Sequence, residues 1–190
     1  MTPEVGQALL AGVQVLDALG LRYAVVGGLA VSAWAQPRST RDVDLYADLP
    51  ESLRPRVKRE LEALGFHVPA MAEELQKFGV FRSRAASSGT FLDIFDATGP
   101  LGEKILERRK QFPVEGRSLW FIAPEELALL KAFSDRERDF EDLVALFKHL
   151  GKKLDRAYID QWAHALDESI GGDEVSQRIE RARRLASRQP

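Results

Sequence analysis

Apolar residues recur at helical spacing near both ends of the chain and in short strand-like runs through its middle. From Pro3 onward, Val5, Leu9, Val13 and Leu16 recur every three or four positions, which predicts a first helix. Gly20 is a helix stop signal. The apolar run 21–26 that follows predicts a short buried strand.

The order of the remaining elements predicts the fold class. Further strands are expected at 43–45, 78–82, 90–95 and 119–122, and further helices at 29–35, 50–64 and 101–110. After Pro124 the pattern is helical, with breaks at 151 and 171–172. We therefore predict an α+β fold: a mixed β-sheet core with flanking helices over 1–123, and a C-terminal helical bundle over 124–190.

Composition narrows the classes of function. The 190 residues are 45% hydrophobic and 29% charged, with a formal net charge of −2, so a nucleic-acid site would need a local basic patch. There are no cysteines, which excludes disulfides and thiolate metal sites and fits a reducing cytoplasm. No apolar run approaches the roughly 20 residues of a membrane helix, and no signal peptide is expected at the start.

A pair of acidic residues on a predicted strand is the first candidate for chemistry. Asp42 and Asp44 are two positions apart, so both carboxylates leave the same face of the strand. Adjacent carboxylates repel each other unless a cation lies between them, and Mg²⁺ prefers such hard oxygen ligands together with substrate phosphates. The alternative is the solvent-facing end of a surface strand.

Two glycines supply a candidate phosphate-binding turn. Gly27 and Gly28 end one predicted strand and open a helix, where free backbone N–H groups favour a phosphate. Glycine has no Cβ to obstruct the approach of that phosphate. The alternative is a tight strand-to-helix turn without a ligand.

A third carboxylate lies in the predicted strand 90–95. Asp93 has apolar neighbours on both sides, and burial of such a group is costly without a partner. Asp96, just beyond, competes for the same role, and an edge strand that points Asp93 to water is the other interpretation. We favour Asp93 because its neighbours fix the direction of the strand.

Taken together, these motifs resemble the nucleotidyltransferase superfamily of the polymerase beta type. The resemblance rests on VVGGLAVSAWAQPRSTRDVDLYAD, followed on a later strand by FLDIF. It implies a mixed sheet, two Mg²⁺ ions (Mn²⁺ as a substitute) and a nucleoside triphosphate (NTP). Gly27 and Gly28 match the phosphate turn, and Asp42, Asp44 and Asp93 match the metal ligands. Many relatives carry Ser where this chain has Gly28.

The second half resembles the AbiEii/MenT-type toxins and related nucleotidyltransferases. In FIAPEELALLKAFSDRERDFEDLVAL, a Pro-Glu pair opens a helix that bears Lys131, and an Arg-Asp-x-x-Asp-Leu run follows. Lys131 lies in an apolar stretch, where it either binds a triphosphate or extends from a core helix to solvent. Asp139 and Asp142 share one helix face and either orient Lys131 or a substrate hydroxyl, or are solvated.

Three residues beside the acidic pair are further candidates for phosphate contact. Arg38 and Arg41, with Thr40 between them, flank the strand of the acidic pair, where they either hold a phosphate or an acceptor strand or neutralise the surrounding acids. The arginine-rich segment 178–188 is interleaved with Glu180 and lacks aromatic residues, so it indicates a solvated helix face rather than a nucleic-acid platform.

The predicted reaction is Mg²⁺-dependent transfer of a nucleoside monophosphate from an NTP such as ATP to an acceptor hydroxyl. tRNA, a protein and a small molecule such as an antibiotic are all compatible acceptors, because the fold alone does not settle function. The resemblance also allows a toxin that is neutralised by an antitoxin partner. The rival hypothesis is a non-catalytic nucleotide- or partner-binding module that keeps the fold.

Overall fold

The computed structural model describes residues 1–69 and 75–188. The chain divides into two compact units. The first consists of residues 1–30 and 38–122, and the second of residues 31–37 and the chain from Ala123 onward.

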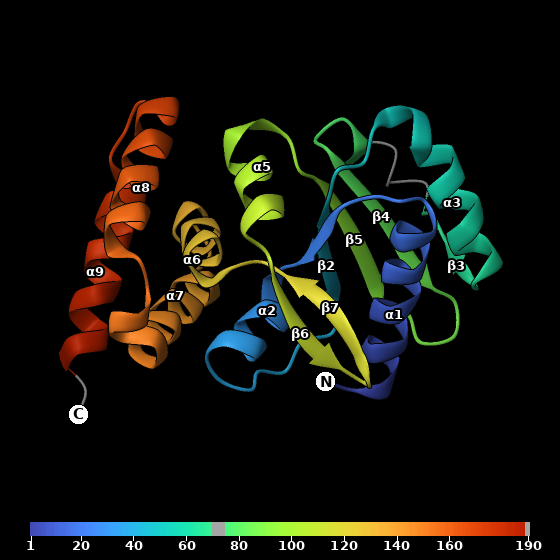
Figure 1. Cartoon of the computed structure of the whole chain (residues 1–190), viewed down its shortest axis with the longest axis horizontal. Helices are drawn as coiled ribbons and strands as arrows, with labels where there is room; N and C mark the ends of the chain where they lie inside the picture. Colours follow the sequence, from blue (N-terminus) through green and yellow to red (C-terminus); the bar gives the residue numbers. More distant parts are fainter. Residues whose placement is uncertain (70–74, 189–190) are drawn as a thin grey trace. The chain divides into compact units, whose positions relative to one another are not determined.

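The first unit is built on a seven-stranded mixed sheet with the order β3-β4-β5-β2-β1-β7-β6. The strands are β1 (Tyr23–Val25), β2 (Val43–Ala47), β3 (Phe66–His67), β4 (Val80–Ala85), β5 (Phe91–Asp96), β6 (Lys110–Val114) and β7 (Arg117–Phe121). The pairs β1–β7 and β2–β5 are parallel, and the other neighbours are antiparallel. Figure 1 shows β6 and β7 as a hairpin at one edge.

Helices α1 (Pro3–Ala18) and α3 (Arg54–Ala63) pack against each other beside this sheet, and α1 contacts β2 and β5 (Figure 1). Gly12 permits the close approach of α1, because a Cβ there would lie 3.0 Å from both Cδ atoms of Leu92 and 3.2 Å from Leu45 Cδ1. Leu45 and Leu92 are fully buried. The acidic residues that alternate with them, Asp44 and Asp93, therefore belong to the sheet face turned away from α1.

The described residues of the first unit form further elements. A 3₁₀ turn η1 (Glu51–Leu53) precedes α3, and α5 (Gly99–Arg108) packs against β1 and β2 through buried Ile105 and Leu106. Helix α2 (Gly27–Trp34) begins in the first unit and continues into the second.

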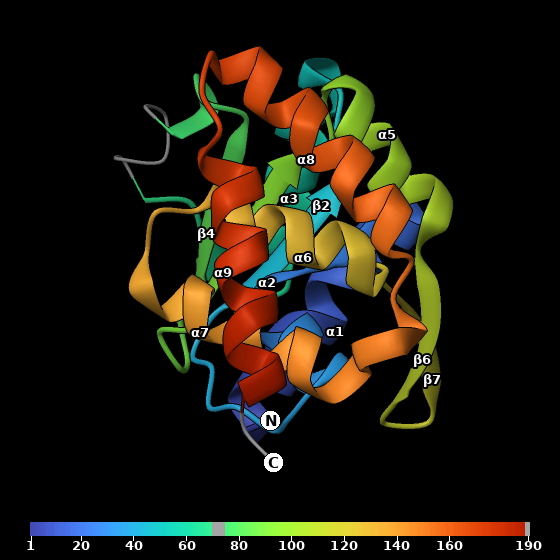
Figure 2. The same ribbon diagram turned by 90° about the vertical axis from the view of Figure 1, so that its left-hand side faces the viewer.

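The second unit is helical, as the sequence pattern predicts. It contains α6 (Pro124–Phe133), α7 (Glu137–Leu150), a 3₁₀ turn η2 (Gly151–Lys153), α8 (Arg156–Ile170) and α9 (Glu174–Arg188). Helix α6 contacts α7, α8 and α9, and the view in Figure 2 faces these four helices. Gly151 and Gly171 end helices with positive φ, at two of the predicted breaks.

The structure corrects several predicted boundaries. The strand predicted at 78–82 runs from Val80 to Ala85, and the helix predicted at 101–110 ends at Arg108, because β6 starts at Lys110. Strands β3 and β6 were not predicted. No described helix has the length and apolar character that a membrane span requires.

Candidate active site

Gly27 forms the turn between β1 and α2, and its conformation brings the chain against Asp44. Its φ of +60° lies in the left-handed region, which glycine adopts without steric cost. A Cβ at this position would overlap Asp44 Oδ2 and would lie 2.8 Å from Asp44 Cγ. The backbone N–H of Val26 also donates to the Asp44 carbonyl at 2.9 Å. The glycine turn and the second carboxylate of the acidic pair are therefore in direct contact.

Gly28 brings the connection before β2 close to the start of α2. A Cβ on Gly28 would lie 3.0 Å from Thr40 Oγ1 and 3.3 Å from Arg38 Nη2. The Thr40 hydroxyl donates to the Asp42 carbonyl at 3.2 Å. Thr40 thus lies where a serine side chain at position 28 would have to fit, which gives a steric reason for glycine in this chain.

Asp44 and Asp93 are neighbours in the sheet. In the parallel pairing of β2 with β5, Asp44 lies directly opposite Asp93, and Tyr46 lies opposite Phe95. The two rings stack with centroids 5.5 Å apart, so the strands are also in contact through side chains beside the acids. Asp93 is only 4% exposed, whereas Asp44 is half-buried and Asp42, just before β2, is exposed.

Arg82 on β4 binds the third carboxylate and was not identified from the sequence. Arg82 is paired with Asp93 across the antiparallel β4–β5 ladder. Its Nε donates to Asp93 Oδ1 at 2.7 Å and its Nη2 to Oδ2 at 2.5 Å. The hydrogen bond to Asp93 raises the pKa of Arg82 against the opposing effect of burial, and the charges of Asp93, Asp42 and Asp44 raise it further.

The register of the hairpin is a signal from which Arg82 could have been found. The N–H of Ala85 donates to the Thr90 carbonyl, which closes the β4–β5 turn. Counting outward from that turn in an antiparallel ladder places position 82 opposite position 93.

Asp96, the competitor of Asp93, lies elsewhere. Alternation along β5 puts it on the opposite sheet face from Asp93, where it pairs with Arg54 of α3 at 3.4 Å.

The side chains beside the glycine turn fit a divalent metal ion only in part. Asp44 and Asp93 offer hard oxygen ligands in adjacent strand positions, and the missing Cβ of Gly27 makes room for the Asp44 carboxylate. Within 1–69 and 75–188, however, no group of three or more His, Cys, Asp or Glu side chains is arranged to hold a metal. Both oxygens of Asp93 face Arg82 instead.

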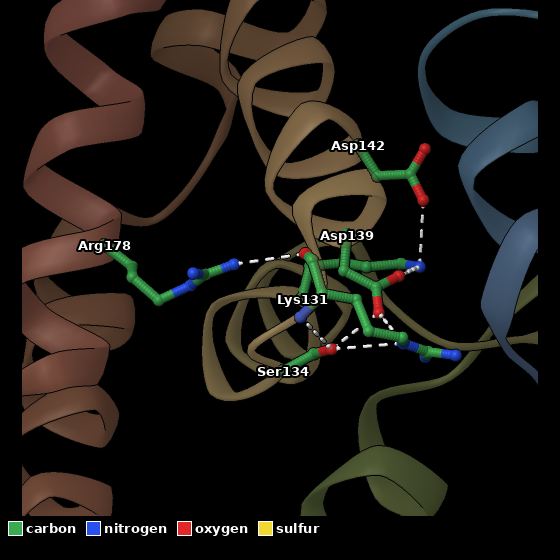
Figure 3. A network of polar contacts seen from close by, with 6 residues as sticks. Lys131, Ser134, Asp139, Asp142 and Arg178 are labelled. Carbon is green, nitrogen blue, oxygen red and sulfur yellow. Dashed lines mark hydrogen bonds and ion pairs between the residues drawn. The ribbon is translucent and has the colours of Figure 1, made fainter.

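Lys131 and Asp139 belong to the second unit, where they form one buried polar cluster (Figure 3). The Lys131 ammonium of α6 donates to Asp139 Oδ1 and pairs with Asp142 Oδ2 at 2.9 Å. Asp139 Oδ2 also accepts from Ser134 Oγ at 2.6 Å and from Arg136 Nε at 2.7 Å. The side chains of Lys131, Asp139 and Asp142 are at most 8% exposed. Asp139 and Asp142 therefore share a helix face, and both pair with Lys131.

The cluster changes the acidity of Asp139. Burial by itself would raise the pKa of Asp139. Hydrogen bonds from Lys131 and Ser134, together with the charges of Lys131 and Arg136, outweigh burial and lower this pKa below its ordinary value of 3.8.

A mixed sheet that sets two carboxylates beside a glycine turn at the start of a helix defines the class as a nucleotidyltransferase fold. The chain belongs to a family described as "Nucleotidyltransferase of unknown function (DUF6036)", whose model matches residues 11–184. The chain is therefore a nucleotidyltransferase, and both the predicted superfamily and the predicted class of enzyme are confirmed. No curated protein matches the chain in sequence.

Solved structures of nucleotidyltransferases share the fold. The antibiotic-resistance factor ANT(2'')-Ia matches with a TM-score of 0.60 and 17% identity, over 90% of this chain and 99% of that one. The lincosamide antibiotic adenylyltransferase LnuA matches with a TM-score of 0.53 and 20% identity, over 77% and 96% of the two chains. An antigenic nucleotidyltransferase-like protein from Paracoccidioides brasiliensis matches with a TM-score of 0.52 and 17% identity, over 95% and 94%. These similarities confirm the predicted fold class.

Proposed function

We propose that this nucleotidyltransferase transfers a nucleoside monophosphate from ATP or another NTP to an acceptor hydroxyl, in a Mg²⁺-dependent reaction in the cytoplasm. The acceptor hydroxyl gives up its proton to solvent and its oxygen forms a bond to the α-phosphorus, while the bond from that phosphorus to the bridging oxygen breaks and pyrophosphate leaves. The observation that carries the proposal is the parallel register that sets Asp44 beside Asp93, with Asp44 against the Gly27 turn.

In this proposal the first unit binds the reacting phosphates. Asp42, Asp44 and Asp93 would hold two Mg²⁺ ions, for which Mn²⁺ can substitute. When bound, these ions neutralise phosphate charge and lower the pKa of the attacking hydroxyl. Backbone N–H groups at Gly27 and Gly28, at the positive end of α2, would bind the triphosphate.

Four side chains would assist the binding of the triphosphate. Arg38 and Thr40 lie against Gly28, so a phosphate at the start of α2 would be within reach of a guanidinium and a hydroxyl. Lys131 has three N–H donors, of which the pairs with Asp139 and Asp142 account for two. We propose that a phosphate oxygen takes the third and that Asp139 fixes the direction of the ammonium.

The acceptor is proposed as one of three hydroxyl classes: a small molecule, tRNA or a protein. Two similar structures concern antibiotic modification: ANT(2'')-Ia was solved with adenylyl-2''-tobramycin and LnuA with lincomycin, so small molecules are the first class to test. A toxin that modifies tRNA or protein and is neutralised by an antitoxin would catalyse the same transfer of a nucleoside monophosphate.

The test is transfer of label from NTPs that carry ³²P at the α- or the γ-phosphate, with Mg²⁺ and each acceptor class in turn. The α-label should enter one acceptor class, the γ-label should leave as pyrophosphate, and Asp44→Asn should abolish both. Transfer of the γ-label to the acceptor would instead identify a kinase and overturn the proposal. Growth arrest on expression, relieved by Asp44→Asn, would assign the reaction to a toxin.

A further inference from the structure

Arg82 has no role in the proposed reaction. It nevertheless binds both oxygens of Asp93, one of the three proposed metal ligands. The guanidinium forms a bidentate pair with Asp93, at 2.7 and 2.5 Å. The side chain of Asp93 is 6% exposed and that of Arg82 is 32% exposed. A buried carboxylate with a planar bidentate partner is a strongly held group.

A metal ion and the Arg82 guanidinium cannot both bind the Asp93 carboxylate closely at the same time. Mg²⁺ or Mn²⁺ takes carboxylate oxygen lone pairs directly, and its double charge repels a guanidinium that lies a few ångströms away. Arg82 has an alternative position, because its side chain is partly exposed and its Cζ already lies 5.1 Å from the centroid of the Phe91 ring. It can therefore leave the carboxylate without burying an unpaired charge.

We propose that Arg82 competes with a divalent metal ion for Asp93, so that metal binding at the third carboxylate displaces the guanidinium. This inference rests on the proposed function, in which Asp93 is a metal ligand. Arg82 then acts as a positioning residue: it holds Asp93 in place and sets how much metal is needed to complete the site. If the pair were only structural, Arg82 would support the β4–β5 ladder without influencing metal affinity.

Arg84 provides a matched control on the same strand. It lies two residues further along β4, on the same sheet face, and its Cζ is 5.4 Å from the centroid of the same Phe91 ring. Its Nε, however, donates to the Gly89 carbonyl at 3.1 Å. Arg84→Gln therefore removes one positive charge from the same face of the same strand without releasing a carboxylate.

The experiment is Mn²⁺ binding, followed by electron paramagnetic resonance of the free ion, to the full-length wild type, Arg82→Gln and Arg84→Gln. Arg82→Gln should bind Mn²⁺ at least about tenfold more tightly, since one charge-assisted pair no longer competes. Arg84→Gln should bind as the wild type does. In an Asp93→Asn background, Arg82→Gln should no longer change the affinity. If Arg82→Gln binds Mn²⁺ as the wild type does, or more weakly, the proposed competition between Arg82 and the metal ion is wrong.

A second measurement is made on the wild-type protein and does not depend on Arg82→Gln. The Nε–H of Arg82, assigned in ¹⁵N spectra by its loss in Arg82→Lys, should be protected from exchange by its bond to Asp93. Saturating Mg²⁺ should remove that protection, and unchanged protection at saturation overturns the proposal even if Arg82→Gln fails to fold. Absence of Mn²⁺ binding in every protein would overturn the proposed function itself, whereas normal wild-type binding with no effect of Arg82 overturns only this inference.

Discussion

Gly27 combines an unusual backbone conformation with a close contact to the Asp44 carboxylate. Its positive φ turns the chain from β1 into α2, and the space that a Cβ would fill is taken by the Asp44 carboxylate. Two separate constraints therefore favour glycine here. The first is the cost of a left-handed conformation, and the second is a direct collision with a proposed metal ligand.

Gly27→Ala should lower the free energy of unfolding by more than the backbone conformation alone explains. Gly20 supplies the comparison, because it has a similar φ of +67° and, apart from its two chain neighbours, no atom of the described residues lies within 4 Å of the point that a Cβ would occupy there. Gly20→Ala should cost about 1 kcal/mol from strain, and Gly27→Ala clearly more, about 2–3 kcal/mol. Urea unfolding of both variants measures the difference. Equal losses would mean that Asp44 moves aside without cost.

Lys131 shows how a buried charge depends on its partners. Lys131→Met would leave Asp139 and Asp142 buried side by side without their shared cation. We expect the free energy of unfolding to fall by about 3 kcal/mol, as when one partner of a buried ion pair is removed. The exposed Lys152 serves as the control, and Lys152→Met should change stability by less than about 0.5 kcal/mol. Unchanged stability in Lys131→Met would show that the two acids have adequate partners without the lysine.

At the scale of elements, α6 and α7 are joined by this same cluster, and the connection between them is part of it. Lys131 lies on α6, Ser134 ends that helix, and Asp139 lies in the first turn of α7. The acidic first turn of α7 also suits the positive end of the helix. Protonation of Asp139 should therefore loosen the helix pair.

The pH dependence of stability should reveal this contribution. The pKa of Asp139 is lower in the folded protein than its ordinary value of 3.8, so its contribution is fully present above that value. It is lost as the pH falls below 3.8 through the folded pKa. Asp139→Asn should be less stable than the wild type at neutral pH, and the difference in the free energy of unfolding should disappear as the pH falls below 3.8. A stability difference that stays constant down to the lowest pH at which the protein folds would contradict the lowered pKa of Asp139.

The sequence predicts the elements best where apolar periodicity is strong and worst at the sheet edges. Strand β6 was missed because it is an edge strand with exposed positions and Pro113 within it, a pattern that edges tolerate and central strands do not. Strand β3 has only two residues, too few to show a period. Strand β3 depends on pairing with β4, which lies further along the chain, and β6 depends on its hairpin with β7.

The sequence predicts some residues of the candidate site but not others, for a related reason. Spacing places Asp44 and Asp93 on strands, but the register between those strands comes from tertiary pairing. Arg82 was missed because an arginine in a strand is typical of an exposed position, and only the hairpin register sets it opposite Asp93. For Lys131, the sequence identified the right acids but could not decide between an internal partner and a phosphate.

At the scale of the whole molecule, each unit pairs some of its buried aspartates with a cation of the same unit. In the first unit Arg82 binds Asp93, and in the second Lys131 binds Asp139 and Asp142. Binding of a metal–NTP complex would therefore exchange internal partners for ligand partners. Such an exchange predicts that ligands act on stability as well as on activity.

Mg²⁺ or Mn²⁺ should accordingly raise the thermal stability of the wild-type protein. Binding to the folded state alone contributes about 2.7 kcal/mol when the free ion is at a hundred times its Kd. The double variant Asp42→Asn with Asp44→Asn should remain folded and lose this shift. A shift of the same size in the double variant would place the metal at other residues.

The most direct test of the central claim is calorimetric titration with an NTP analogue whose α,β-bridging oxygen is replaced by a methylene group, because binding does not require the acceptor to be known. With Mg²⁺ present, the wild type should bind one analogue per chain. Chelation of the metal, or the pair Asp42→Asn with Asp44→Asn, should weaken binding by at least about a hundredfold, as expected when charge-assisted contacts are lost. Equal affinity with and without metal, unchanged in the double variant, would contradict the assignment of these carboxylates to a metal–nucleotide site.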